Sequence, residues 1–178
     1  MANKQALREL QTRLAERMRV ARTQPRGQSW LAVECRGQGL LLPLEQAGEI
    51  FALVPLLPVP HTQPWFAGVA NLRGGLHGVV DLARFLNLPE AAAADLGRDQ
   101  ARLIALGASL GLNSALLVDR LAGLRSVEQL HADAENDNQA DSARPLFAPT
   151  RWRDADGRSW QVLDLAALAH DVRFLSIV

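Results

Sequence analysis

The side chains that could catalyse a reaction or hold a metal ion are scattered along this chain. The four histidines, His61, His77, His131 and His170, form no pair at the spacing of a metal-binding motif. Cys35, the single cysteine, lies in an apolar segment without a neighbouring histidine. This setting favours a buried structural thiol over a nucleophile. We therefore expect no catalytic residue, no metal and no cofactor, and another protein as the ligand.

One short segment combines an arginine with turn glycines and apolar strands. It reads Gly68-Val-Ala-Asn71-Leu-Arg73-Gly74-Gly75-Leu-His-Gly-Val-Val-Asp81. Glycine adopts positive φ at little steric cost, so Gly74 and Gly75 predict a tight hairpin turn. Asp81 is placed to cap a helix over 82–86. The guanidinium of Arg73 would then be displayed at the turn, where it could make a bidentate contact with a partner.

The same pattern occurs a second time near the end of the chain. Residues 157–166 align without gaps on residues 74–83, in the order glycine turn, apolar strand and Asp-Leu-Ala step. The dipeptide Asp156-Gly157 is a strong hairpin signal. The shared register favours a duplication over a chance match, so we expect two related β-rich halves.

Length and composition are consistent with a globular protein. The chain has 178 residues and a hydrophobic content of 48%, enough for one ordinary domain or two small barrels. A single cysteine is compatible with a reducing compartment. No apolar run approaches the ~20 residues of a membrane helix, and no secretory signal is evident. We expect a cytoplasmic protein without direct membrane insertion.

The charges divide the chain into a basic arm and an acidic body. Residues 1–26 carry seven basic and two acidic residues, whereas the remainder carries twelve basic and seventeen acidic ones. The arm could contact an anionic partner, or it could be a solvated helix. A small β-barrel nucleic-acid-binding module that uses this arm is the alternative function. Such a module needs a basic groove with stacking aromatic residues, and the acidic body argues against it.

Hydrophobic periodicity predicts one helix followed mainly by strands. Leu7, Leu10, Leu14 and Met18 form the apolar stripe of a helix over 3–22. The predicted hairpins are 29–35 with 40–44, 102–106 with 114–118, and the last one within 152–163. The proline-rich segment 55–64 should be irregular or at an edge. The acidic segment 131–144 is predicted to be a loop, and the apolar tail should pack back onto the body.

These motifs together resemble the signature of the CheW-like domain family. The matching residues, in chain order, are Glu49-Ile50, Pro58-x-Pro60, Asn71-Leu72-Arg73-Gly74, Leu116-Leu-Val118-Asp119 and Leu163-Asp164-Leu165. The resemblance covers about residues 29–170. Within the family, the chain is most similar to the PilI-type adaptors of type IV pilus (twitching) chemosensory systems.

The resemblance implies a mainly β fold of two intertwined five-stranded SH3-like β-barrels, with an N-terminal amphipathic helix and short helices. Residues 1–26 would be the basic amphipathic helix and linker, and residues 27–178 the CheW-like domain. The first barrel would span about 29–90 and the second about 100–170, with terminal segments crossing between them.

The resemblance also implies a non-enzymatic cytoplasmic adaptor. Its partners would be the regulatory domain of a CheA-type histidine kinase and the cytoplasmic tip of a methyl-accepting chemoreceptor, with no nucleic acid. The partner-binding residues that we expect from the matched motifs are Glu49, Asn71, Leu72, Arg73, Gly74 and Val118.

Overall fold

The computed structural model describes residues 29–89, 98–132 and 145–178. The helix predicted over 3–22 and most of the acidic loop predicted over 131–144 lie outside the described residues.

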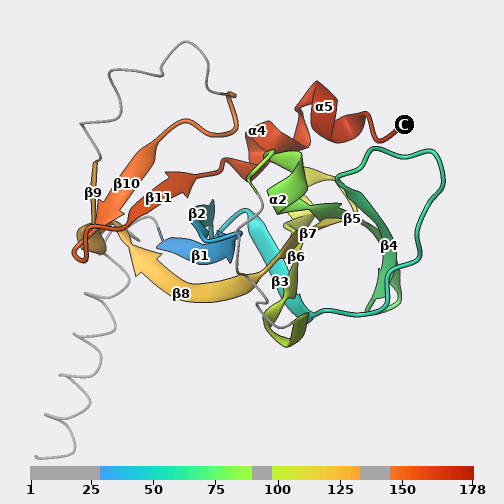
Figure 1. Cartoon of the computed structure of the whole chain (residues 1–178), viewed down its shortest axis with the longest axis horizontal. Coiled ribbons are helices and arrows are strands. Elements are labelled where there is room, and N and C mark those ends of the chain that lie inside the picture. The colour runs from blue at the N-terminus through green and yellow to red at the C-terminus, as the bar shows by residue number, and fades with distance from the viewer. Residues whose placement is uncertain (1–28, 90–97, 133–144) are drawn as a thin grey trace, which may run out of the picture.

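The strands form two curled sheets that lie next to each other (Figure 1). In order of hydrogen bonding, sheet A consists of β8 (Arg120–Ser126), β1 (Ser29–Cys35), β2 (Gln38–Pro43), β11 (Ser159–Val162), β10 (Arg151–Asp154) and β9 (Leu130–Ala132). Sheet B consists of β3 (Ala47–Ala52), β6 (Arg102–Leu106), β7 (Ser114–Val118), β5 (Gly75–Asp81) and β4 (Phe66–Leu72).

Short helices connect the strands, and α2, α4 and α5 lie along one side of the two sheets (Figure 1). The α-helices are α2 (Leu82–Phe85), α4 (Leu165–Ala169) and α5 (Val172–Leu175). The 3-10 turns are η1 (Arg98–Gln100), η2 (Ala108–Leu110) and η3 (Val127–Gln129). As predicted, the tail packs back onto the body: Phe174 is buried, and Gln63 N–H donates to the Ile177 carbonyl at 2.8 Å.

The mainly β fold with two curled sheets is confirmed, but sheet A has six strands where the resemblance implied five. The sixth is β9, a three-residue strand that pairs with the outer side of β10. Each sheet also contains strands from both predicted barrel ranges, 29–90 and 100–170. The β1–β2 hairpin lies beside β8 and β11, and the β6–β7 hairpin lies between β3 and β5.

The duplicated segments have the same local structure. In the first, β5 leads into α2 and the Asp81 carboxylate accepts from the Arg84 backbone N–H at 3.0 Å. In the second, β11 precedes α4 and the Asp164 carboxylate accepts from the Ala167 N–H at 3.1 Å. Each of the two strands also pairs in parallel with a strand from the other half of the chain, β5 with β7 and β11 with β2. The helix cap predicted at Asp81 is thus confirmed.

Both faces of the β1–β2 hairpin are buried, which explains its nearly continuous apolar sequence. Side chains alternate between faces along a strand. In β1, Leu31 and Val33 pack into the core cluster shared with sheet B, while Trp30 and Ala32 pack into a smaller cluster within sheet A. Cys35 belongs to the shared core and is fully buried, and this burial raises the pKa of its thiol. Its predicted structural role is consistent with this setting.

The proline-punctuated segment closes sheet B, and a glycine makes the closure possible. Leu57 and Val69 exchange two backbone hydrogen bonds, of 2.8 and 2.9 Å, in an isolated bridge. Beside this bridge Gly68 has φ +126°, and a Cβ built on it would lie 2.3 Å from the Leu57 carbonyl oxygen. A side chain at this position would therefore force the segment away from β4.

We expect Gly68→Ala to destabilise the fold by more than Gly37→Ala. Gly37 also has positive φ, but a Cβ there meets nothing within 4 Å. The control variant then measures the cost of a left-handed φ in open space, about 1–2 kcal/mol, whereas Gly68→Ala combines a less favourable φ of +126° with the close approach. Urea unfolding followed by circular dichroism measures both. Equal losses of unfolding free energy would show that the close approach at Leu57 relaxes without cost.

Candidate partner-binding surface

The Arg73 motif forms a two-residue turn between β4 and β5. Leu72 pairs with Gly75, so the turn residues are Arg73 and Gly74, with φ of 49° and 86°. Arg73 therefore lies at the turn as predicted, but of the two glycines only Gly74 is a turn residue, because Gly75 already belongs to β5. The Asn71 side-chain oxygen accepts from the Gly74 N–H at 2.8 Å and braces the turn. A two-residue turn with positive φ at both residues matches the right-handed twist of the two strands that it joins.

Arg73 occupies a backbone region that disfavours residues with a side chain. Its φ of 49° lies in the left-handed region, which Asn or Gly would adopt more readily than Arg. Such strain is found preferentially at functional positions. The turn holds the Arg73 side chain out into solvent, with 76% of it exposed.

Arg73 forms an ion pair with Glu49, another of the predicted partner-binding residues. Arg73 Nη2 lies 2.6 Å from Glu49 Oε1. Glu49 is on β3, and β3 and β4 are the two outer strands of sheet B in the hydrogen-bonding order. The ion pair therefore joins two edges of the curled sheet. Because both side chains are exposed, we expect it to contribute at most about 1 kcal/mol to stability. A guanidinium has five N–H donors, so Arg73 retains capacity for a second acceptor.

The remaining predicted residues divide into exposed and buried ones. Asn71 and Gly74 are exposed at the turn. Leu72 and Val118 are 3% and 1% exposed, respectively, and pack in the interior. Any role of Leu72 or Val118 in binding would therefore be to position the exposed residues.

Exposed apolar side chains that were not among the predicted partner-binding residues lie on the strands and segment next to this turn. Leu76 is directly opposite Asn71 in the β4–β5 hairpin and is 65% exposed. Ile50 follows Glu49 on β3 and is also exposed, as is Leu57 in the segment bridged to β4. Alternation along 75–81 does not identify Leu76 as exposed, because Leu76 lies on the same face of the strand as the buried Val80. We call Glu49, Ile50, Asn71, Arg73 and Leu76 the turn surface.

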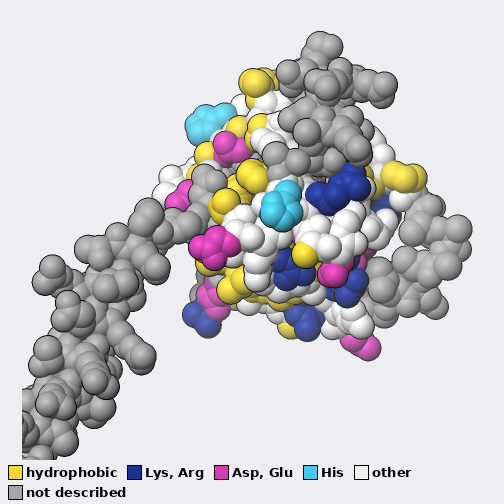
Figure 2. Space-filling model, turned by 90° about the vertical axis from the view of Figure 1, so that its left-hand side faces the viewer, with side chains coloured by type: hydrophobic (Ala, Val, Ile, Leu, Met, Phe, Trp, Pro, Cys, Tyr) yellow, Lys and Arg dark blue, Asp and Glu magenta, His cyan; other side chains and the backbone are white. Residues whose placement is uncertain are grey.

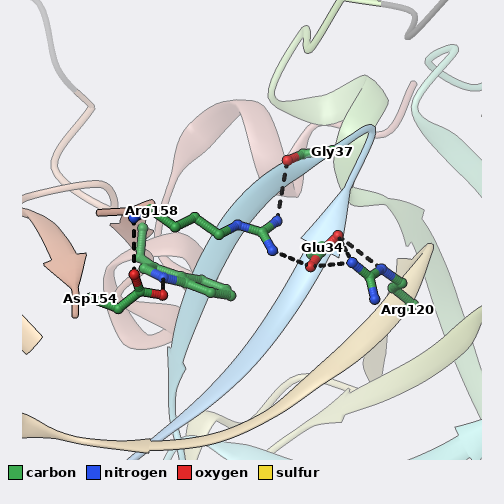
Figure 3. Close-up of polar contacts among 6 residues, drawn as sticks. Glu34, Gly37, Arg120, Asp154 and Arg158 are labelled. Carbon is green, nitrogen blue, oxygen red and sulfur yellow. Dashed lines mark hydrogen bonds and ion pairs between the residues drawn. The ribbon is translucent and has the colours of Figure 1, made fainter. Parts of the chain in front are cut away.

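A second charged cluster differs from the turn surface in being centred on a buried carboxylate (Figure 3). Glu34 on β1 is 3% exposed and accepts from Arg120 Nε and Nη2, at 2.8 and 2.7 Å. Arg158 Nη1 donates to the same carboxylate at 2.6 Å from the β10–β11 turn. Burial alone would raise the pKa of Glu34, but its hydrogen bonds to Arg158 and Arg120 hold it below its usual value.

Trp160 fixes the Arg158 side of this cluster. The Arg158 guanidinium lies over the Trp160 ring, 4.6 Å from the centroid. The indole N–H donates to the Asp154 carboxylate at 2.8 Å. Partial burial opposes ionisation of Asp154, but this hydrogen bond and those from the backbone of Arg158 and Asp156 lower its pKa. Gly39 makes room for the ring, since a Cβ there would lie 2.7 Å from it. The cluster thus ties β1, β2, β8 and the β10–β11 turn together.

We expect Glu34→Gln to lower the unfolding free energy by about 2–3 kcal/mol near pH 7, because it leaves two guanidiniums without their shared carboxylate. The folded-state pKa of Glu34 is depressed, so its stabilisation is present above the ordinary pKa of 4.5 and is lost as the pH falls through the lower folded value. In urea unfolding between pH 3 and 7, we therefore expect the unfolding free energies of the natural protein and of Glu34→Gln to converge at acid pH. The control is Glu45→Gln, because Glu45 is exposed. A difference in unfolding free energy between the natural protein and Glu34→Gln that does not change with pH would show that ionisation of Glu34 is not its cause.

Within residues 29–89, 98–132 and 145–178, no group of three His, Cys, Asp or Glu side chains is arranged to hold a metal ion. In the same residues, no helix is long and apolar enough to cross a membrane.

Comparison with known proteins agrees with this architecture. The family model described as CheW-like domain matches residues 29–173. Among solved structures, the scaffolding protein TtCheW from Thermoanaerobacter tengcongensis is similar, with a TM-score of 0.65 and 15% sequence identity. The match covers 85% of this chain and 98% of that one. No curated protein matches this chain significantly. At such low identity the structural likeness shows the fold alone, but the family match spans most of the chain. The protein belongs to the CheW-like domain family.

Proposed function

We propose that this protein is a non-enzymatic adaptor in chemotaxis-type signal transduction. It would couple methyl-accepting chemoreceptors to a CheA-type histidine kinase of a two-component system in the cytoplasm. Membership of the CheW-like family supports this role, as does the likeness to a protein described as a scaffold. The observation that carries the proposal is the exposed Arg73, held by a strained two-residue turn beside exposed apolar side chains.

The composition of the turn surface suits protein recognition. Arginine and apolar side chains are enriched at protein interfaces, where the apolar groups supply burial and the guanidinium supplies direction. Leu76 and Ile50 would lose water on binding, at about 25 cal/mol per Å² of apolar area. Arg73 would then orient the partner by a bidentate contact with a carboxylate. Glu49 would hold the guanidinium in place until the partner arrives.

We assign this surface to the regulatory domain of the kinase and to the receptor's cytoplasmic tip as its two partners. The pathway that we propose is that of the PilI-type adaptors in type IV pilus, or twitching, systems. The support for this narrower assignment is the basic N-terminal segment 1–26 and the motif spacing.

The surface of sheet A gives no support to the nucleic-acid alternative. On the face seen in Figure 2, arginine side chains and acidic side chains are interspersed among apolar and polar ones. Among the described residues, Trp30 and Trp160 are buried, and the remaining aromatic side chains are buried or half-buried. Single-stranded nucleic acid needs a basic groove with exposed aromatic rings, so a binding module of that kind is disfavoured.

We expect Arg73→Glu to weaken binding to the kinase regulatory domain at least tenfold while leaving the fold intact. The substitution reverses the charge at the turn surface and places two carboxylates, Glu49 and the new one, side by side. Surface plasmon resonance with the immobilised kinase domain measures binding, and thermal melting measures the fold.

The charge swap Arg73→Glu with Glu49→Arg separates a binding role from a purely structural one. The swap restores an ion pair between β3 and the turn but leaves no arginine at position 73. If Arg73 contacts the partner, binding stays weak although the melting temperature recovers. Recovery of full binding by the swapped protein would show that the ion pair, rather than Arg73 itself, is what the partner requires.

A further inference from the structure

Two exposed leucines lie on the face of sheet A that elsewhere packs into the shared core. Leu124 on β8 pairs with Leu31 on β1, which in turn pairs with Leu42 on β2. Leu31 and Leu42 belong to the shared core, whereas Leu124 is 60% exposed. Leu44 comes two residues after Leu42, so it lies on the same face, and it is 42% exposed. The apolar face of the shared core is therefore left exposed at this end of sheet A.

Leu44 and Leu124, which we call the leucine pair, flank the point at which residues 1–28 join the body. The Leu44 N–H donates to the Ser29 carbonyl at 3.0 Å, which continues the β1–β2 pairing by one residue. On the other side of Ser29, β8 ends at Ser126, two residues after Leu124, so β1 begins where β8 ends (Figure 1). From the spacings within and between strands, the backbones of both leucines lie within about 10 Å of Ser29.

The segment that precedes Ser29 carries an apolar stripe of its own. Four apolar side chains recur in it at helical spacing, namely Leu7, Leu10, Leu14 and Met18. Residues 23–28 separate the helix predicted over 3–22 from Ser29. When extended, a linker of this length spans up to about 20 Å. The linker therefore allows the helix to fold back and bring Leu14 and Met18 onto the leucine pair.

The charges around the leucine pair favour the same contact. Residues 1–26 carry seven basic and two acidic residues. Two exposed carboxylates lie at this end of sheet A, because Glu45 follows Leu44 and Glu128 comes two residues after Ser126. Ion pairs at a surface contribute little to stability, so these carboxylates would orient the basic segment while the leucines supply apolar burial.

We propose that the apolar stripe of residues 3–22 docks on the leucine pair of the same chain and covers the exposed end of the shared core. A short tether holds the stripe at an effective concentration on the order of mM, so a contact with a dissociation constant below about 1 mM is mostly formed. A second copy of the chain or a separate partner lacks this advantage. The docking is independent of the proposed adaptor function, because the turn surface belongs to sheet B.

The first test is disulfide cross-linking in the full chain under a mild oxidant. Leu14→Cys is combined with Leu124→Cys, and in the matched control Glu16→Cys is combined with Leu124→Cys. Glu16 is about 160° from Leu14 around the predicted helix and so lies on its opposite face. We expect the disulfide within one chain to form at least tenfold faster from position 14 than from position 16. Cys35 is fully buried and does not compete.

The second test is the rate at which trypsin cleaves the natural full chain at the arginines within residues 1–26. We expect Leu124→Asp and, separately, Leu44→Asp to raise this rate at least fivefold, because a charge at either position opposes docking of the apolar stripe. The control is Val172→Asp, because Val172 on α5 is also exposed, at 76%, but is not part of the leucine pair. Melting temperatures identify a variant that fails to fold, and the other leucine variant then carries the test.

A disulfide-linked dimer as the main product from positions 14 and 124 would assign the leucine pair to a second copy and overturn docking within one chain. Equal cross-linking rates from positions 14 and 16, or unchanged cleavage in both aspartate variants, would overturn the docking itself. None of these measurements involves Arg73 or kinase binding, so the adaptor proposal is tested separately.

Discussion

Four strand pairings join the two halves of this chain, and the remaining architecture depends on them: β1–β8 and β3–β6 are antiparallel, and the other two are parallel. In sheet A, β2 pairs with β11, and in sheet B, β5 pairs with β7. In both pairs, one strand comes from each half of the chain. Neither half therefore completes a sheet by itself, and the shared core fills the space between the sheets. The turn that carries Arg73 follows β4, whose partner β5 is held by β7, so its position depends on the second half of the chain.

The two carboxylate–arginine clusters differ in burial, and this difference distinguishes a contact that stabilises the fold from one that could exchange for a contact with a partner. Glu34 is buried and bound by two arginines whose own side chains are partly exposed, so removing it would leave two guanidiniums without their shared carboxylate. Glu49 makes an equally short contact with Arg73, but both side chains face water. A solvated ion pair exchanges partners at little cost. The chemistry is the same in both clusters, and only the exposed one is suited to an external ligand.

Local signals predicted the elements well, and long-range relations poorly. The Asp81 cap and the hairpin over 29–44 followed from residue types and turn spacing. The sheet to which the β1–β2 hairpin belongs did not follow from the sequence. Both faces of this hairpin are buried, so its sequence has no polar face that would indicate its orientation. Arg73 lies at the predicted turn, but Gly75 was assigned to the turn although it begins β5, since both glycines tolerate positive φ. The ion pair of Arg73 with Glu49 was not foreseen either, because the curvature of sheet B creates it.

The two Arg-Gly turns show that neighbours decide what a displayed arginine does. Arg36-Gly37 joins β1 to β2 and Arg73-Gly74 joins β4 to β5, both with positive φ at each residue. Local sequence makes the turns equivalent. Arg36, however, lies half-buried against the Leu88 carbonyl, whereas Arg73 projects into solvent beside Glu49. The same backbone conformation therefore holds one guanidinium against the body of the fold and displays the other to solvent. Packing around each turn, rather than the dipeptide itself, determines whether the arginine is held within the fold or displayed on its surface.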